Sequence, residues 1–293
     1  MKSAPMNAPV RRIWLCADDY GMAPGINAAI RELIAGGRLN ATSVMMPVPH
    51  IGRAETDALM AANAGDRRAQ IGLHVTLTAP FAPMSAGFAP LRGGAFLPHR
   101  ELMQAAVLRR LKPEALTREI AAQMSAFIET FGRAPDFVDG HQHVQLLPQV
   151  RDAFLKVTAE LAPNAWVRQC GRARRTRRLH DSKALVLDIL SMGFRGKAAH
   201  QGLATNPAFA GAYAFTATAN FPDIFPRFLA GLPDGGLIMC HPGYVDDALM
   251  ALDPLTTLRE RELDYFRSGA FPRLLTERGF ALASPTGDGG KAP

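Results

Sequence analysis

A carboxylate, a glycine and two histidines fall within the short segment Asp139–His143. A β-branched and aromatic run precedes them and predicts a strand, so these polar side chains would lie at its end. On an extended strand, His141 and His143 would point to the same face and share one pocket. A carboxylate and two imidazoles suit a divalent metal with open coordination positions, and such a metal suits the hydrolysis of an unreactive amide or ester. Histidines at a strand end are also often structural, and the segment alone leaves both interpretations open.

Other predicted strands end on polar residues as well. In a parallel (β/α) barrel all these ends open on one face, so residues far apart in the sequence would converge there. A second carboxylate beside the metal would serve as a base, and a histidine across the site would protonate a leaving amine. The residues concerned are Asp18 and Asp19 after a strand at 12–17, His74 in a strand at 70–78, Arg168 in a strand at 165–170, and His241 at the end of a strand at 236–241.

Strand-like and helical runs alternate along the chain without a long polar linker, which favours one α/β domain. We predict a single-domain (β/α) barrel, incomplete or distorted, with its active site at the carboxyl ends of the strands. Residues 1–10 are expected to form a flexible tail, 11–284 the barrel, and 285–293 a disordered tail. A charged run at 255–278 predicts one helix, and the apolar, Gly- and Pro-rich stretch at 81–98 is too irregular for a helix or strand.

Composition restricts the location and the partners of the protein. Its 293 residues contain only three cysteines, none at C-x-x-C spacing, which favours a reduced, cytoplasmic setting. The net charge of +7 includes five arginines between 172 and 178. No aromatic residues are interleaved with them, which argues against nucleic acid, so the run is either a solvated surface or a patch for an anionic membrane. The oligomeric state stays open.

Four motifs, taken together in this order, resemble the YdjC-type carbohydrate deacetylases, which include the chitooligosaccharide deacetylases. The resemblance covers almost the whole chain, and it implies a (β/α) barrel that removes N-acetyl groups from a sugar. The motifs are A-D-D-Y-G (17–21), G-L-H-V-T-L-T (72–78), D-G-H-Q-H-V (139–144) and C-H-P-G (240–243).

The resemblance also implies roles for individual residues. Asp19, His74 and His141 match the metal ligands, although His143 stays open as the alternative to His141. Asp18 corresponds to the general base and His241 to the general acid. One divalent ion is implied; two histidines favour zinc, and the carboxylate and open positions also admit magnesium. The residues expected to support the site or bind substrate are Asp139, His143, Arg168, Tyr20 and Tyr244.

Within this family the chain is most similar to the hopanoid-biosynthesis-associated HpnK branch. The segments D-G-H-Q-H-V-Q-L-L-P (139–148) and T-N-P-A-F-A-G-A-Y (205–213) carry this similarity. The branch implies a glycolipid substrate, N-acetylglucosaminyl hopanoid, whose hydrocarbon would need an apolar approach. The loop after His74 supplies candidates for that approach, namely Phe81, Met84, Phe88, Leu91 and Phe96.

Three alternatives remain beside a hopanoid deacetylase. A chitooligosaccharide deacetylase would use the same site on an amino-sugar without lipid. An iron oxygenase would also use two histidines and one carboxylate, but it leaves Asp18 and His241 without a role. A non-catalytic sugar-lipid binding protein would account for the arginines and the apolar loops, and it predicts that Asp18→Asn leaves the biological role intact.

Overall fold

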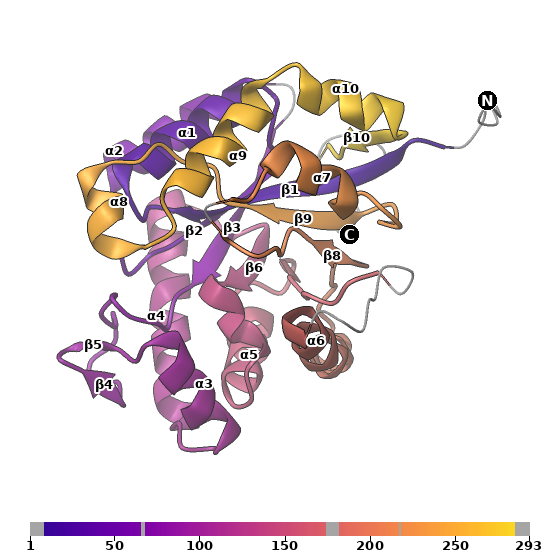
Figure 1. The fold of residues 1–293 in the computed structure, drawn as a ribbon. Coiled ribbons are helices and arrows are strands. Elements are labelled where there is room, and N and C mark those ends of the chain that lie inside the picture. The colour runs from indigo at the N-terminus through magenta and orange to yellow at the C-terminus, as the bar shows by residue number, and fades with distance from the viewer. Residues whose placement is uncertain (1–8, 66–67, 174–181, 217, 285–293) are drawn as a thin grey trace.

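A curled β-sheet surrounded by helices forms the body of the molecule (Figure 1). The computed structural model describes residues 9–65, 68–173, 182–216 and 218–284. The strands of the main sheet are β1 (Arg11–Tyr20), β2 (Ala41–Val44), β3 (Gln70–Val75), β6 (Phe137–Gly140), β7 (Trp166–Val167), β8 (Phe209–Ala210), β9 (Gly236–Cys240) and β10 (Phe280–Leu282). The helices are α1 (Pro24–Ala35), α2 (Arg53–Ala62), α3 (His99–Val107), α4 (Pro113–Phe131), α5 (Val150–Leu161), α6 (Ser182–His200), α7 (Phe221–Phe228), α8 (Asp247–Leu252), α9 (Thr257–Arg267) and α10 (Ala270–Glu277).

The paired strands of this sheet are all parallel, in the order β7-β6-β3-β2-β1-β9-β8, and β10 also pairs with β1. The two edges of the sheet are joined by main-chain bonds, because Val167 N donates to Ala204 O and Phe209 N to Gly171 O, each at 2.9 Å. The sheet therefore curls into a distorted (β/α) barrel, as the sequence predicts.

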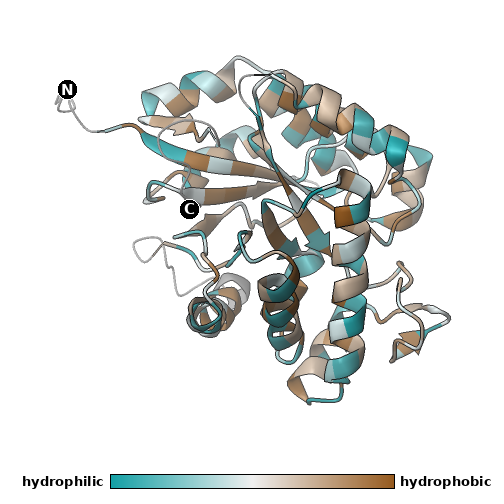
Figure 2. Ribbon diagram, turned by 180° about the vertical axis from the view of Figure 1, so that it is seen from behind, coloured by the Kyte–Doolittle hydropathy of each residue, from teal (hydrophilic) through white to brown (hydrophobic). Residues whose placement is uncertain are grey.

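Strand β1 lies inside the sheet, between β2 and β9, and is buried from Ile13 to Tyr20, as expected where helices cover the outer face of a barrel and side chains fill its interior. Figure 2 shows hydrophobic residues along most of the sheet and both kinds of residue on the helices around it. Packing between strands is close at Gly72, where a Cβ atom would lie 2.5 Å from the Phe137 ring. That ring stacks on Trp166 with 4.6 Å between ring centroids.

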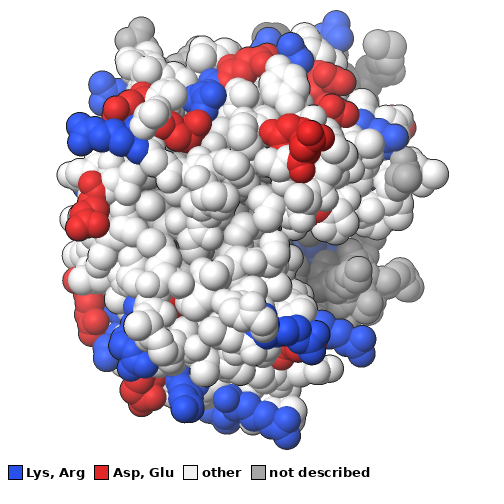
Figure 3. Space-filling model, turned by 90° about the vertical axis from the view of Figure 1, so that its left-hand side faces the viewer, with Lys and Arg blue, Asp and Glu red and all other residues white. Residues whose placement is uncertain are grey.

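Because the strands are parallel, their carboxyl ends reach the same side of the molecule, on the left of Figure 1. Figure 3 views this side and shows a broad surface without charged residues, with Lys, Arg, Asp and Glu confined to its periphery. Exposed apolar side chains on the segments that follow three of the strands are Met84 (44% exposed) and Phe215 (43%) on loops, and Met250 (58%) on helix α8.

The predicted single helix at 255–278 is wrong, because the structure contains α9 and α10 with a break at Ser268 and Gly269. Ser268 has an extended ψ of 157°. Its side-chain oxygen accepts a hydrogen bond from Ala270 N at 3.3 Å. Serine often ends a helix in this way, because its hydroxyl competes for main-chain groups.

The stretch at 81–98 contains a short hairpin, which the sequence analysis did not predict. Strands β4 (Leu91–Arg92) and β5 (Ala95–Phe96) pair in antiparallel fashion. Gly93 and Gly94 turn between them with φ values of 59° and 85°, which favour glycine. Of the five apolar residues proposed as a substrate approach, Phe81, Phe88 and Phe96 are buried, whereas Met84 and Leu91 are exposed.

Parts of the predicted tails and of the arginine run, namely residues 1–8, 285–293 and 174–178, lie outside the described residues. Arg172 is described, and its guanidinium is paired with Asp188 Oδ2 at 2.9 Å. Within the described part of the chain, no helix combines the length and the apolar character needed to cross a bilayer.

Candidate metal and catalytic site

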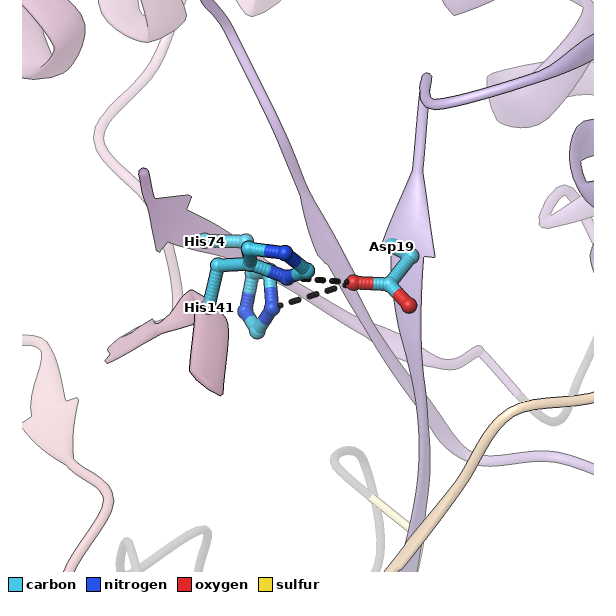
Figure 4. A group of neighbouring side chains, drawn as sticks. All are labelled: Asp19, His74 and His141. Carbon is cyan, nitrogen blue, oxygen red and sulfur yellow. Dashed lines mark hydrogen bonds and ion pairs between the residues drawn. The ribbon is translucent and has the colours of Figure 1, made fainter. Parts of the chain in front are cut away.

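Asp19, His74 and His141 meet at the carboxyl ends of β1, β3 and β6 (Figure 4). Asp19 Oδ1 lies 3.4 Å from His74 Nε2 and 2.9 Å from His141 Nδ1. All three residues are buried, and one ligand atom of each lies within 4.8 Å of the others. One carboxylate oxygen and two imidazole nitrogens are a suitable donor set for zinc or a similar ion.

Asp18 and Asp19 are consecutive in the sequence, but their carboxylates contact different side chains. Asp19 has a left-handed φ of 71°, and the pairing of β1 with β2 shifts register between Ala17 and Tyr20. Aspartate adopts this conformation more readily than most residues. The change in backbone direction sends Asp19 toward the two histidines, while Asp18 pairs with Arg168.

The His74 ring is held from behind by Asp139, whose Oδ1 lies 2.6 Å from His74 Nδ1. Ser43 Oγ lies 3.0 Å from the same nitrogen. Burial alone would lower the pKa of His74, but the Asp139 carboxylate outweighs it and raises the pKa to about 10. Carboxylates commonly orient metal-binding histidines in this way, and here Nε2 is left to face Asp19.

Arg168 is fully buried between two carboxylates. Its Nη1 and Nη2 donate to Asp18 Oδ2 and Oδ1 at 2.6 and 2.7 Å, and Nη2 lies 2.5 Å from Asp139 Oδ2. Burial would raise the pKa of Asp18, but the Arg168 guanidinium outweighs it and holds that pKa well below its usual range. Asp18 is therefore ionised at neutral pH.

Replacing Arg168 with methionine is expected to destabilise the fold by about 3–5 kcal/mol, because the carboxylates of Asp18 and Asp139 would stay buried without their cation. Thermal and urea denaturation, monitored by circular dichroism, measure this change. The exposed Arg12→Met is the matched control, and its expected effect is within about 0.5 kcal/mol. An Arg168→Met protein as stable as the control would show that Arg168 does not neutralise this part of the site.

A second cluster, Cys16, Asp18 and Asp139, also has ligand atoms within 4.8 Å of one another. Its centre is taken by Arg168, whose Nη2 lies 3.0 Å from Cys16 Sγ and contacts both carboxylates. A guanidinium already pairs with the two acidic groups there. Among the described residues, Asp19, His74 and His141 are therefore the better candidate for a metal site.

The expectation that His141 and His143 point to the same pocket is wrong. Strand β6 ends at Gly140, and a 3-10 helix, η1 (His141–Leu146), follows with left-handed φ values at Gln142 and His143. His141 turns to Asp19, whereas His143 Nδ1 lies 3.5 Å from Cys170 Sγ. Burial, followed by the charge of Arg168, lowers the pKa of His143 to about 3, so this ring is neutral.

His241 follows the end of β9 and is half-buried. Its main-chain N donates to Glu262 Oε2 at 2.6 Å, and its ring makes an edge contact with Phe215 at a centroid distance of 5.6 Å. Among the residues that the structure describes, none hydrogen-bonds its buried Nδ1. Nδ1 of this ring is therefore not engaged by another described group.

The structure adds a buried cation that the sequence analysis did not single out. Arg259 Nη2 donates to Asp19 Oδ2 at 2.7 Å and to Asp253 Oδ2 at 2.6 Å. Burial would raise the pKa of Asp19, but Arg259 and His141 hold it well below its usual range. Arg259 lies in the run R-E-R-E-L, which is typical of a solvated helix surface, and this pattern concealed it.

Tyr20 and Tyr244, expected to support the site or bind substrate, lie in other hydrogen-bond networks. The Tyr20 hydroxyl is bonded to Glu55 and Arg31 between α1 and α2. The Tyr244 hydroxyl donates to Glu32 at 2.6 Å on the outside of the barrel. Of the other expected residues, Asp139 holds the candidate ligand His74, and Arg168 holds Asp18. His143 contacts Cys170 and lies apart from the candidate ligands Asp19, His74 and His141.

A curled parallel sheet with two histidines and one carboxylate at its carboxyl ends defines the class: a (β/α)-barrel protein with a candidate divalent-metal site. The family description YdjC-like protein matches residues 12–277, so the chain belongs to the YdjC-like family.

Two comparisons place the chain among known proteins. The carbohydrate deacetylase of Homo sapiens is 28% identical over 257 residues, which cover 82% of this chain and 77% of the human protein. The crystal structure of a proposed cellobiose-phosphate cleavage protein from Enterococcus faecalis V583 superposes with a TM-score of 0.71. It covers 94% of this chain and 97% of the other at 19% identity, a similarity that shows the shared fold.

Proposed function

We propose that this protein is a metal-dependent N-deacetylase that hydrolyses the acetamide of an N-acetylglucosamine conjugate. The observation that carries the proposal is the buried Asp19, His74 and His141 triad beside the ionised Asp18, with His241 at the end of another strand. Membership in the YdjC-like family and similarity to the human carbohydrate deacetylase support the sugar substrate.

A divalent ion held by Asp19, His74 and His141 would activate water and polarise the acetyl carbonyl. Both ring orientations favour such an ion, because Asp139 fixes the His74 ring and η1 turns the His141 ring inward. The two nitrogens favour zinc over magnesium.

Two side chains, Asp18 and His241, carry out the proton transfers. Asp18 takes the proton of the attacking water at a carboxylate oxygen, and Arg168 keeps that carboxylate ionised and fixed. His241 gives a proton to the nitrogen of the departing amine. The products are a free amino-sugar and acetate, and the amine must be protonated because an amide anion is a very poor leaving group.

For the aglycone we propose the hopanoid of the HpnK branch. The surface on the side of the strand ends lacks charged residues (Figure 3), and the exposed Met84 and Phe215 there support an apolar aglycone. Met84 and Phe215 are exposed on two loops that contact the candidate site. Phe81, on the same loop as Met84, packs on His141 with 6.1 Å between ring centroids, and Phe215 packs on His241 with 5.6 Å between ring centroids. A chitooligosaccharide, being polar along its length, would gain little from these side chains.

Mass spectrometry of the zinc-loaded protein with N-acetylglucosaminyl hopanoid, and separately with N,N′-diacetylchitobiose, tests the proposal. Loss of about 42 Da from the hopanoid alone, abolished by a chelator, would support both the chemistry and the lipid substrate. Loss from chitobiose alone would retain the deacetylase and reject the hopanoid. An unchanged mass in both would count against the proposed function.

Exchanging Met84 and Phe215 together for serine is expected to raise KM for the hopanoid conjugate by about tenfold or more, since a ligand that covers the exposed part of each side chain gains less than half of the about 1.5–3 kcal/mol of complete burial from each. KM for a water-soluble N-acetylglucosamine glycoside should stay within about twofold of the wild-type value. The exposed Val107→Ser on α3 is the control. Equal changes in both KM values would contradict an apolar aglycone site at these residues.

We further propose that the protein acts in the cytoplasm, with peripheral contact to an anionic membrane. The three cysteines are free and buried, which is compatible with a reducing compartment. Arg172 is held by Asp188 and does not support lipid binding, so this part of the proposal depends on the remaining arginines of the run at 174–178.

A further inference from the structure

Helix α9 presents two buried ionic side chains to the candidate site. Arg259 and Glu262 are each 1% exposed, although the helix is strongly charged along its length. Residues three apart lie on the same face of a helix, so both reach inward from adjacent turns. Burying two charged groups is unfavourable unless each has a specific partner, and the partners here belong to the site.

Arg259 acts on the carboxylate of the candidate metal site. Its Nη2 donates a hydrogen bond to Asp19 Oδ2 at 2.7 Å, whereas the other oxygen, Asp19 Oδ1, faces His74 and His141. Asp253 accepts from the same Nη2 at 2.6 Å, which fixes the guanidinium from the other side. With Oδ2 occupied, Asp19 can offer an ion one oxygen rather than two, which leaves more positions for water and substrate.

Glu262 acts on the segment that carries the candidate proton donor. Its Oε2 accepts from the main-chain N of His241 at 2.6 Å, and its Oε1 accepts from the Tyr213 hydroxyl at 2.7 Å. A second bond joins the same two segments, since Gly243 N donates to Arg259 O at 3.2 Å. The turn after β9 is thus bonded twice to α9, on either side of Pro242.

We propose that α9 is the positioning helix of this site, with Arg259 holding Asp19 as a single-oxygen ligand and Glu262 holding the His241 main chain so that its ring reaches the leaving amine. Neither residue touches the reacting atoms. The Glu262 part rests on the proposed deacetylase function, whereas the Arg259 part concerns metal affinity and can be tested without turnover.

Isothermal titration calorimetry of the metal-free protein with Zn²⁺ tests the Arg259 part. Arg259→Met is expected to weaken binding by about 10–100-fold, the usual effect of losing a residue that orients a metal ligand. Arg259→Lys should recover part of this loss, and the exposed Glu260→Gln on the same helix should leave affinity unchanged. Wild-type affinity in a folded Arg259→Met protein would overturn this part of the proposal.

Two substrates with the same acetyl group test the Glu262 part. The acetamide needs a proton on its leaving amine, whereas 4-nitrophenyl acetate releases a stable phenolate without one. Glu262→Ala is expected to lower kcat on the acetamide by about tenfold or more, while KM, ester hydrolysis and Zn²⁺ affinity stay within about twofold of wild type. Glu262→Gln should restore most of the activity, because its amide oxygen can still accept from His241 N.

The outcomes separate the inference from the proposed function. A parallel loss on amide and ester in Glu262→Ala, or weakened Zn²⁺ binding in that variant, would show a general structural role and overturn the Glu262 part. If the wild-type protein hydrolyses neither N-acetylglucosaminyl hopanoid nor N,N′-diacetylchitobiose, the proposed function is rejected, and the Glu262 part is rejected with it. The Arg259 part would still be decided by the measured Zn²⁺ affinities, which do not depend on turnover.

Discussion

Asp18→Asn is expected to lower turnover of the acetamide by about 10²–10⁴-fold, the usual contribution of a positioned general base. The asparagine side chain has the same shape but cannot accept the proton of the attacking water. Steady-state kinetics by acetate release measure the loss. Zn²⁺ content by inductively coupled plasma mass spectrometry should stay near one ion per chain, because the three candidate ligands are retained.

Stability must be followed in the same experiment, because Asp18 is 2% exposed and bidentate with Arg168. Circular dichroism at the assay temperature shows whether the variant is folded. Tyr244→Phe is a suitable control, since among the described residues its hydroxyl bonds only to Glu32, outside the site, and full activity is expected. A folded, metal-loaded Asp18→Asn enzyme with wild-type turnover would remove Asp18 from the mechanism.

His141→Ala is expected to weaken Zn²⁺ binding by more than about 100-fold, because loss of a ligand exceeds the 10–100-fold effect of losing a residue that only orients one. Acetamide turnover should fall in proportion to the metal lost. Calorimetry and metal analysis after dialysis provide the measurement. His141 is 8% exposed, so the alanine leaves a small cavity near the surface rather than in the deep core.

The companion variant His143→Ala distinguishes the two neighbouring histidines. His143 contacts Cys170 and packs on Phe209 at a centroid distance of 5.6 Å, away from the triad. Its Zn²⁺ affinity is therefore expected to stay within about threefold of the wild-type value, below the loss expected for a residue that orients a ligand. If His143→Ala lost the metal and His141→Ala retained it, the assignment of ligands would have to be reversed.

Sequence periodicity predicted most elements of the barrel, because buried parallel strands and amphipathic helices leave strong local patterns. Helix α4 runs from Pro113 to Phe131, with proline in its first turn and Gly132 in the left-handed conformation after it. The errors arose where single side chains or unusual backbone angles decide the outcome. Ser268 divides the last helical run, and φ values above 50° at Gln142 and His143 end the extended conformation after Gly140.

Strand patterns predicted that polar residues at strand ends converge, and the structure brings Asp19, His74 and His141 of that group together. The choice of these three as metal ligands came from the family resemblance and stays a prediction, and the residues that reach the site from a helix were not predicted. Nothing local distinguishes Arg259 or Glu262 from the exposed charges around them on α9. Their burial depends on the contacts of α9 with α1, α7 and α10, with Asp19 and with the turn after β9, which a periodicity argument does not contain.

The pairing of β1 has a consequence for the order in which the protein can fold during synthesis. The strand at residues 11–20 pairs with β2, but also with β9 at 236–240 and β10 at 280–282. Its last partner, β10, is translated long after β1 itself. Sheets that depend on such distant pairings fold slowly and expose apolar strands meanwhile. The nascent chain would therefore hold all three candidate metal ligands long before Arg259 arrives, and an ion captured at that stage would meet a looser site than the finished one.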